Sequence, residues 1–485
     1  MMGEVVMNRS RKASILTKCK YPLIALASFA FIILGAIAVP KFLIQSKSKN
    51  NITGVTSVQD NVILDFSDTS TSTGESNDKI TWYEDNETPQ GEYVSNGETQ
   101  SGVVDIDYSS ISVRASVRLI SGDAYEAVGT PQYKAFETLS NNKRLNGKLL
   151  PNWKQIQRYL LLVIKYSFGG KNMDDIVSEN GGSIPDDLND IDKWQMDEDE
   201  CDWKGIVCTK QTVTQIDISG DECVGTIPPE IGYLSDIDYL DLARTGISGS
   251  IPEELYDLRY LKMLTLSKNN LAGTLSEKIG QLTNLVDLRL DYNSLSGRIP
   301  DGIGTLTEAR FILLRSNKFS RNLPYTVGGL ENVYYFDASM NKLRGELPRS
   351  FAKLRMLGCL YLDHNLFDGT IPKEWNSFNP YIEVMHLNDN RLTGGLPESW
   401  GLLNIMASLK VHNNRFDKQP FNPDICQNAV FDSQWELIEL TSDCHFCTCK
   451  VFCDICYLNG KRVVNPDPNW QVTRTYLINS ITEGN

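Results

Sequence analysis

The chain has 485 residues, of which 41% are hydrophobic and 22% are charged. That composition supports a sizeable folded core and excludes a wholly disordered protein. The net charge is −14, and because a nucleic-acid binder normally presents a basic surface to phosphates, this class of function is disfavoured. Much of the charge is local, since residues 51–130 hold 14 acidic and 3 basic side chains.

The first predicted element is a membrane-spanning helix. Residues 21–40 are an uncharged run, long enough to cross ~30 Å of hydrocarbon. More basic residues precede the run than follow it, which favours a cytoplasmic tail of residues 1–20 and a single-pass type II orientation. A cleaved signal peptide is the alternative, because Ala36-Ile37-Ala38 has the form of a cleavage site. In both cases the chain after Pro40 is extracellular or lumenal.

Residues 41–130 are predicted to be a disordered acidic stalk, because this polar sequence can bury too little apolar surface to offset the entropy lost on ordering the chain. Asn51 and Asn86 lie in glycosylation sequons there. The alternative for Asn51, which lies close to the predicted membrane span, is a chance sequon without a glycan.

A helical N-terminal cap is predicted for residues 131–212. Two segments place apolar side chains at helical spacing: Tyr133, Phe136 and Leu139 in the first, then Trp153, Ile156, Leu160 and Val163 in the second. Pro151 opens the second segment. The stretch from Cys201 to Cys208 follows, and the repeats begin directly after it.

Residues 213–425 carry a repeated asparagine. The asparagines recur every 24 residues, with one interval of 25 before Asn390: Asn269, Asn293, Asn317, Asn341, Asn365, Asn390 and Asn414. Thr245 and Asp221 hold the same position in two earlier repeats. An apolar pair lies five and three residues before the asparagine, and a glycine usually lies four residues after it. This periodicity predicts a stack of repeats that cover one another's apolar faces.

Each repeated position has a physical role. The apolar pair alternates along a short strand, so both side chains point into one core. A buried asparagine amide both donates and accepts, and can therefore pair the backbone groups of a tight turn. Arg321 replaces the glycine of one repeat and Ser276 replaces the proline of another, so irregular turns are expected at these two places.

The unit L-x-x-L-x-L-x-x-N-x-L-x-G-x-I-P resembles the plant-type leucine-rich repeat of extracellular receptor-like proteins, receptor kinase ectodomains and polygalacturonase-inhibiting proteins. Cys201-Asp202-Trp203-Lys204-Gly205-Ile206-Val207-Cys208 resembles the amino-terminal cap of that family. The resemblance implies an α/β solenoid: a right-handed leucine-rich-repeat superhelix of about nine 24-residue repeats, with a helical N-terminal cap and a Cys-rich C-terminal cap. The N-terminal anchor departs from the family, whose members usually carry a C-terminal membrane helix.

Residues that flank the apolar pair are predicted to point outward on the concave sheet. The predicted ligand-binding residues are Tyr239, Arg289, Phe311, Leu313, Arg315, Tyr335, Asp337, Tyr361 and Asp363. Grouped large apolar side chains on a surface usually mark an interaction site, and Tyr and Arg are common hot-spot residues. The alternative is lateral packing that only shields the strands.

Eight cysteines flank the repeats and are predicted to form disulfides of open connectivity, the last six in a C-terminal cap at residues 426–485: Cys201, Cys208, Cys426, Cys444, Cys447, Cys449, Cys453 and Cys456. A zinc site is the alternative for the C-terminal group, which contains two C-x-x-C pairs. Cys223 is expected to be buried, and Cys359 to point outward as a free thiol. His364, His386 and His412 are interpreted as scattered solvated histidines, with a pH-sensitive or metal-binding face as the alternative.

No nucleotide-binding or hydrolase motif is present, so an enzyme is not expected, and no cofactor is predicted. The favoured function is a membrane-anchored receptor-like protein that binds a protein or peptide ligand on its concave face. Two alternatives stay open: an inhibitor of a secreted glycosidase, which requires release from the membrane, and an adhesion or scaffold protein.

Overall fold

The computed structural model describes residues 112–171, 189–377, 382–402, 406 and 408–417, and the backbone of six short strands outside these ranges. The chain divides into two compact units, one within residues 38–237 and the other within residues 238–485. Among the described residues, no helix combines the length and apolar character needed to span a membrane, and the predicted span at 21–40 lies outside them.

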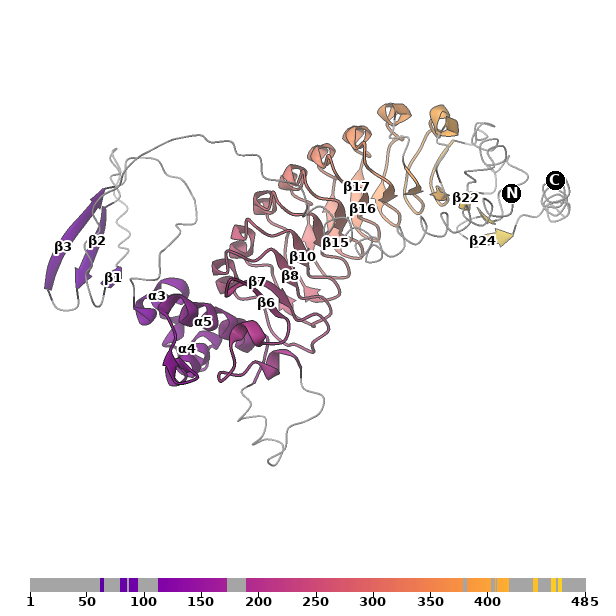
Figure 1. Cartoon of the computed structure of the whole chain (residues 1–485). Coiled ribbons are helices and arrows are strands. Elements are labelled where there is room, and N and C mark those ends of the chain that lie inside the picture. Colours follow the sequence, from indigo (N-terminus) through magenta and orange to yellow (C-terminus); the bar gives the residue numbers. More distant parts are fainter. Residues whose placement is uncertain are drawn as a thin grey trace, which may run out of the picture. The chain divides into compact units, whose positions relative to one another are not determined.

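The unit of residues 38–237 contains helices and antiparallel strands (Figure 1). Its helices are α3 Val113–Ser121, α4 Pro131–Asn141 and α5 Asn152–Ser167, with 3-10 helices η1 Gly122–Tyr125, η2 Ile191–Lys193, η3 Glu200–Asp202 and η4 Pro229–Tyr233. Its strands are β1 Val62–Leu64, β2 Lys79–Glu84, β3 Glu87–Val94, β4 Arg144–Leu145, β5 Lys148–Leu149, β6 Ile206–Thr209 and β7 Thr212–Asp217. The prediction of a disordered stalk over 41–130 is therefore wrong for β1–β3, α3 and η1, which are regular elements.

Helices α4 and α5 form where the apolar spacing predicts them. Thr130 caps α4, because its hydroxyl accepts a hydrogen bond from the Tyr133 N–H, and Pro131 fits the first helical turn. In α5 the side chains of Ile156 and Leu160 are buried as expected. Trp153 differs from the expectation: it lies in the first turn and is 39% exposed.

A buried ion pair fixes the cysteine-bearing turn to α5. The Arg158 guanidinium donates to the Glu200 carboxylate at 2.7 Å, and both side chains are fully buried. Glu200 lies in η3, next to the disulfide between Cys201 and Cys208. Since an isolated buried charge is costly, the pair holds α5 and η3 in one relative position.

The unit of residues 238–485 is a stack of strand–turn–helix repeats (Figure 1). One strand of each repeat joins a parallel sheet: β8 Tyr239–Asp241, β10 Met263–Thr265, β12 Asp287–Arg289, β14 Phe311–Leu313, β16 Tyr335–Asp337, β18 Cys359–Tyr361, β20 Val384–His386 and β21 Ser408–Lys410. Short helices, all 3-10, return the chain: η5 Glu253–Asp257, η6 Glu277–Gln281, η7 Asp301–Thr305, η8 Tyr325–Gly329, η9 Arg349–Lys353, η10 Lys373–Ser377 and η11 Glu398–Leu402.

A second set of short parallel strands follows the asparagine position in the repeats from Thr245 to Asn365. It comprises β9 Ser248–Gly249, β11 Asn270–Leu271, β13 Ser296–Gly297, β15 Lys318–Arg321, β17 Lys342–Gly345 and β19 Leu366–Phe367. Between the two sets lies the single-file core, in which the middle residue of every strand of the first sheet, such as Leu288 or Ile312, is fully buried.

The asparagines form a ladder of hydrogen bonds between successive repeats. From Asn293 onward, each Oδ1 accepts from a backbone N–H of the preceding repeat at 3.0 Å. Each Nδ2 donates to carbonyls of its own repeat and of the preceding one; in Asn341, these include Ala338 at 3.2 Å and Leu314 at 3.0 Å. One side chain thereby pairs buried polar groups on both sides of a turn.

The two turns expected to be irregular are regular. Ser276 adopts φ −74°, close to the −69° of Pro300 in the next repeat, and its hydroxyl caps η6 by accepting from the Lys278 N–H. Arg321 adopts φ 67°, the left-handed conformation that Gly297 and Gly345 adopt in their repeats. Ser276 adopts this φ without strain, whereas the stacking of neighbouring turns overrides the local preference of Arg321.

Three further strands extend the first sheet: β22 Glu439–Asp443, β23 Ile455–Leu458 and β24 Lys461–Val464. Of the C-terminal cysteines, Cys456 lies on the backbone of β23, whereas Cys426, Cys444, Cys447, Cys449 and Cys453 lie outside the described residues, as do Asn51 and Asn86. Cys223 is buried, as expected. Cys359 stands in an outward column of the sheet, as expected, but it is fully buried and disulfide-bonded and is therefore not a free thiol.

Candidate ligand-binding face

The register of the first sheet brings the predicted binding residues together. Phe311 pairs with Asp287 on one side and Tyr335 on the other, and Asp337 pairs with Leu313 and Tyr361 in the same way. Because side chains alternate along a strand, these residues lie on the face opposite to the core. We call this surface, formed by the outward residues of β8 to β21 and the second residue after each strand, the strand face.

An apolar cluster occupies the middle of the strand face. It consists of Phe311, Leu313, Tyr335, Cys359, Tyr361 and Val384, with Tyr334 packed against it. The rings of Tyr335 and Tyr361 are 5.3 Å apart, and that of Tyr361 lies 4.8 Å from His386. All six side chains are at most 8% exposed, so the prediction of a solvent-exposed patch is wrong. Neighbouring parallel strands lie only about 4.8 Å apart, so large side chains in the same column of adjacent repeats pack laterally.

Beside the cluster, Arg289 forms a buried ion pair with Asp287 of the same strand, β12. Its Nε donates to Asp287 Oδ1 at 2.9 Å and its Nη2 to Asp287 Oδ2 at 2.7 Å, and both side chains are buried. Burial raises the pKa of Asp287, against the effect of the Arg289 hydrogen bond. Arg289 was predicted as a ligand contact, but its guanidinium is already paired with a carboxylate, so this part of the face is locally neutral.

Arg315 and Asp337 are joined through Ser339. The Arg315 guanidinium donates to the Ser339 hydroxyl at 2.9 Å, and that hydroxyl donates to Asp337 Oδ1 at 2.6 Å. Burial raises the pKa of Asp337 to about 6. Arg315 remains half-buried and also donates to the Tyr292 hydroxyl at 3.2 Å. Of the predicted cations on this face, Arg315 is therefore the one that reaches solvent.

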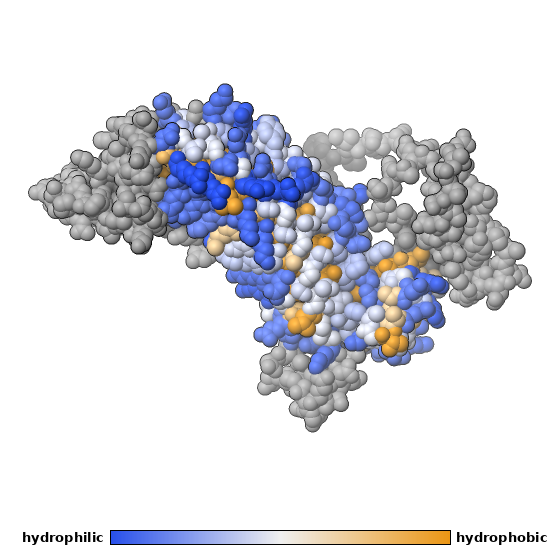
Figure 2. All heavy atoms as spheres, turned by 180° about the vertical axis from the view of Figure 1, so that it is seen from behind, coloured by the Kyte–Doolittle hydropathy of each residue, from blue (hydrophilic) through white to orange (hydrophobic). Residues whose placement is uncertain are grey.

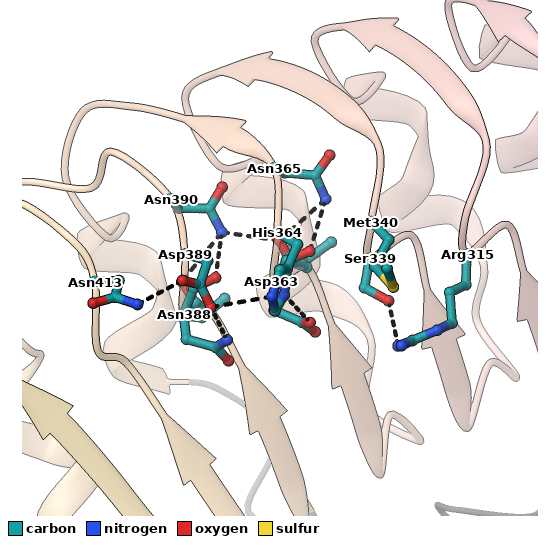
Figure 3. Close-up of polar contacts among 12 residues, drawn as sticks. Arg315, Ser339, Met340, Asp363, His364, Asn365, Asn388, Asp389, Asn390 and Asn413 are labelled. Atoms are coloured by element: carbon teal, nitrogen blue, oxygen red, sulfur yellow. Dashed lines mark hydrogen bonds and ion pairs between the residues drawn. The ribbon is translucent and has the colours of Figure 1, made fainter. Parts of the chain in front are cut away.

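Past the apolar cluster, a polar network connects three repeats (Figure 3). His364 Nδ1 lies 2.8 Å from Asp363 Oδ2, and His364 Nε2 lies 3.4 Å from Asp389 Oδ2. His412 Nε2 lies 3.8 Å from the same Asp389 oxygen. The hydrogen bond to Asp363 raises the pKa of His364. The interpretation of these histidines as scattered is therefore wrong for His364 and His412, which share one aspartate.

Two oxygens of this region have no hydrogen-bond donor, namely Asp363 Oδ1 and Asn388 Oδ1, and both are buried. The two residues occupy equivalent positions in adjacent repeats, and their other polar atoms are bonded to His364 and to Asp389, respectively. Sequence reasoning missed Asn388 and Asp389. The signal was present, because both precede Asn390 in the same way that Asp363 and His364 precede Asn365. Among the described residues, no group of three or more His, Cys, Asp or Glu side chains is arranged to hold a metal ion.

Comparisons with known proteins agree with this repeat architecture. Residues 284–306 match the family model described as Leucine Rich Repeat. The search of curated proteins gives no match. Together with the parallel register of the strands, the family match identifies the fold as a leucine-rich-repeat solenoid.

Three solved structures illustrate the similarity. The plant peptide hormone receptor RGFR1 in complex with RGF2 is 26% identical, with a TM-score of 0.42, over 47% of this chain and 40% of that chain. The ectodomain of the Arabidopsis thaliana receptor kinase GASSHO1/SCHENGEN3, in complex with CASPARIAN STRIP INTEGRITY FACTOR 2, is 21% identical, with a TM-score of 0.48, over 59% and 35%. A plant ice-binding protein is 24% identical, with a TM-score of 0.42, over 58% and 92%. The alignments thus span well under half of the two receptors.

Proposed function

We propose that this chain is a membrane-anchored recognition protein whose strand face binds a protein or a peptide. The membrane anchor in this proposal is residues 21–40, and the repeats lie outside the cytoplasm. The proposal includes no catalytic residue and no cofactor, in keeping with the lack of an enzyme motif in the sequence.

The observation that carries the proposal is the chemistry of the strand face. Its apolar cluster belongs to the outward columns and not to the single-file core, which is already complete without it. Charged groups flank this cluster on both sides: Asp287 and Arg289 before it, Asp363 and His364 after it. Buried carboxylates cost folding energy, and their presence on one face is typical of a site selected for binding.

The burial of the cluster decides which residues make first contact. Side chains on this face that remain half-buried are Tyr239, Asp241, Met263, Arg315, His386 and Lys410. In this proposal Tyr335 and Tyr361 form a rigid floor, and the partner contacts the half-buried side chains around it. A rigid floor lowers the entropy cost of binding, because few side chains need to be ordered.

Capture of the partner by matched charge-reversal variants tests the proposal. The wild-type full chain and two variants are used to capture proteins from secreted extracts. Arg315→Glu changes the strand face, and Lys373→Glu changes η10 on the face formed by the 3-10 helices, which we call the helix side. We expect Arg315→Glu to reduce capture by about tenfold, as for a charged interface contact, and Lys373→Glu to leave it unchanged. Equal melting temperatures establish that both variants are folded. Normal capture by Arg315→Glu, together with loss in Lys373→Glu, would contradict the proposal.

The orientation in the membrane has its own test. Protease added to intact cells should remove a C-terminal tag and spare an N-terminal one, because basic residues flank the N-terminal side of residues 21–40. The reverse pattern would overturn the type II orientation. In the same oxidising setting the C-terminal cysteines should be disulfide-bonded, and mass spectrometry that finds stoichiometric zinc and free thiols would refute this.

A further inference from the structure

The turn that contains each ladder asparagine exposes a surface that borders the strand face, and the two meet where Arg315 donates to the Tyr292 hydroxyl at 3.2 Å. Three positions of every repeat contribute to it: the residue before the asparagine and the residues one and three places after it. We call this surface the asparagine-turn flank. In its middle repeats, Tyr292 and Met340 stand directly before an asparagine, and Lys318 and Lys342 stand directly after one. Arg344 stands three places after Asn341.

Cations are concentrated on the asparagine-turn flank. Residues 238–417 hold 20 acidic and 20 basic side chains, so the repeats as a whole are neutral. The flank itself carries seven cations, which are Arg244, Lys268, Lys318, Lys342, Arg344, Arg391 and Arg415, all of them exposed. Its acidic residues are three: Asp368, Asp389 and Asp417. The excess of basic side chains is therefore a property of this flank and not of the solenoid.

The cations of the flank also lack acidic partners, in contrast to those of the helix side. Within the described part of the chain, no ion pair involves Lys318, Lys342 or Arg344, nor the flank arginines of the first and last repeats. Directly before β8 and β10, Lys262 pairs with Asp238 at 3.0 Å, and on the 3-10 helices Lys278 pairs with Glu253 at 3.6 Å. Charges left unpaired along a row repel one another, so they stabilise nothing in the isolated chain.

Backbone hydrogen bonds set the spacing of the row. The Lys318 N–H donates to the Leu295 carbonyl at 2.7 Å, and the Arg415 N–H donates to the Leu392 carbonyl at 2.7 Å. Successive turns are therefore ~4.8 Å apart, and the seven intervals from Arg244 to Arg415 span ~34 Å. An extended polypeptide of about ten to twelve residues covers that length at ~3.3 Å per residue.

Two large apolar side chains lie within the basic row. Tyr292 is 44% exposed and Met340 is 42% exposed, and the Lys268 ammonium lies 5.7 Å from the Tyr292 ring. Both residues adopt φ 54°, a conformation that glycine takes without cost. The residue before the asparagine has this left-handed conformation in every repeat from Arg244 to Asn413, so the repeat itself sets the backbone that presents these two side chains. Large apolar side chains are also exposed outside the flank, at Tyr260, Tyr325 and Met356. The face drawn in Figure 2 is mainly hydrophilic.

We propose that the asparagine-turn flank is an interaction surface for an extended acidic polypeptide segment. Carboxylates of the segment pair with the row of lysines and arginines, and its apolar side chains contact Tyr292 and Met340. A polypeptide is favoured over an anionic glycan because the row alternates charge with apolar area, which a carboxylated or sulfated sugar chain does not match. The proposal does not depend on a ligand for the strand face.

Fluorescence anisotropy with a defined probe tests this proposal on the full chain. The probe is a labelled peptide of about twelve residues with Glu at alternate positions and Leu and Ser between them. We expect Lys318→Glu combined with Lys342→Glu to weaken binding by about tenfold or more, because attraction becomes repulsion at two adjacent repeats. Raising the salt concentration should weaken binding by the wild-type chain as well.

A matched control carries the same change of charge on the helix side. Arg355→Glu combined with Lys373→Glu reverses two exposed cations and should alter the affinity by less than about twofold. Met340→Ser should weaken binding without changing its salt dependence. Four results would overturn the proposal: no binding of the probe, equal binding of a Gln-substituted probe, equal loss in the control variant, or binding of a sulfated oligosaccharide but not of the peptide.

Discussion

Removal of one ladder amide should destabilise the solenoid by an amount that the structure sets. In Asn341→Ala, the Phe319 N–H loses its acceptor, Asn341 Oδ1 at 3.0 Å. The carbonyls of Leu314 and Ala338 keep other donors, because Asn317 and Asn365 also donate to them, at 3.2 and 2.9 Å. One buried N–H is therefore left unpaired, and the free energy of unfolding should fall by about 1–3 kcal/mol.

Urea unfolding followed by circular dichroism measures this change. Asn270→Ala is the matched control, since it removes an exposed asparagine from the equivalent turn three repeats earlier, where its amide donates to the Gly246 carbonyl. Its effect should stay within about 0.5 kcal/mol. An unchanged unfolding midpoint in Asn341→Ala would show that water reaches the Phe319 N–H, and the reasoning about the ladder would then fail.

Three other substitutions have expected outcomes. Arg321→Gly should raise the free energy of unfolding by about 1 kcal/mol, because it removes a non-glycine residue from a left-handed conformation. Arg344→Gly in the next repeat should lower the free energy of unfolding. A change of the same sign in both variants, measured by urea unfolding, would contradict this. The raised pKa of Asp337, about 6, makes its protonated form favour folding, so stability that is full below about pH 4 is lost as the pH rises through 6. Asp337→Asn should remove up to about 3 kcal/mol of that pH dependence, and an unchanged pH profile of the unfolding midpoint would refute the assignment. Tyr361→Ala should lower the free energy of unfolding by about 3 kcal/mol, because the ring is buried between Tyr335 and His386. Tyr260→Ala, at a site 62% exposed, should lower it by less than about 0.5 kcal/mol. Similar unfolding midpoints for the two variants would contradict this prediction.

The repeat length allowed the register of the strand face to be predicted from the sequence. A fixed interval of 24 or 25 residues places Phe311, Tyr335 and Cys359 in one column, and the strands pair in that register. The same arithmetic could not predict burial. The solvent exposure of a ring in an outward column depends on the side chains beside it. Tyr335 is buried on this face although it lies outside the single-file core.

Pair interactions were only partly accessible from the sequence. Asp287 and Arg289 stand two residues apart on one strand, so alternation alone puts them on the same face, and their pairing could have been predicted. The contact of His364 with Asp389 joins consecutive repeats through side-chain rotamers, which periodicity does not specify. Arg321 likewise adopts the left-handed conformation of the equivalent glycines, because the stacking of the repeats fixes the backbone of this turn whatever its side chain.

Photo-crosslinking tests most directly whether the strand face is the recognition site. A photoreactive amino acid is placed at Arg315 on the strand face or at Lys373 on the helix side, in the full chain on intact cells. The account predicts one discrete crosslinked partner from position 315 and none from position 373. A partner captured from position 373 but not from position 315 would contradict it.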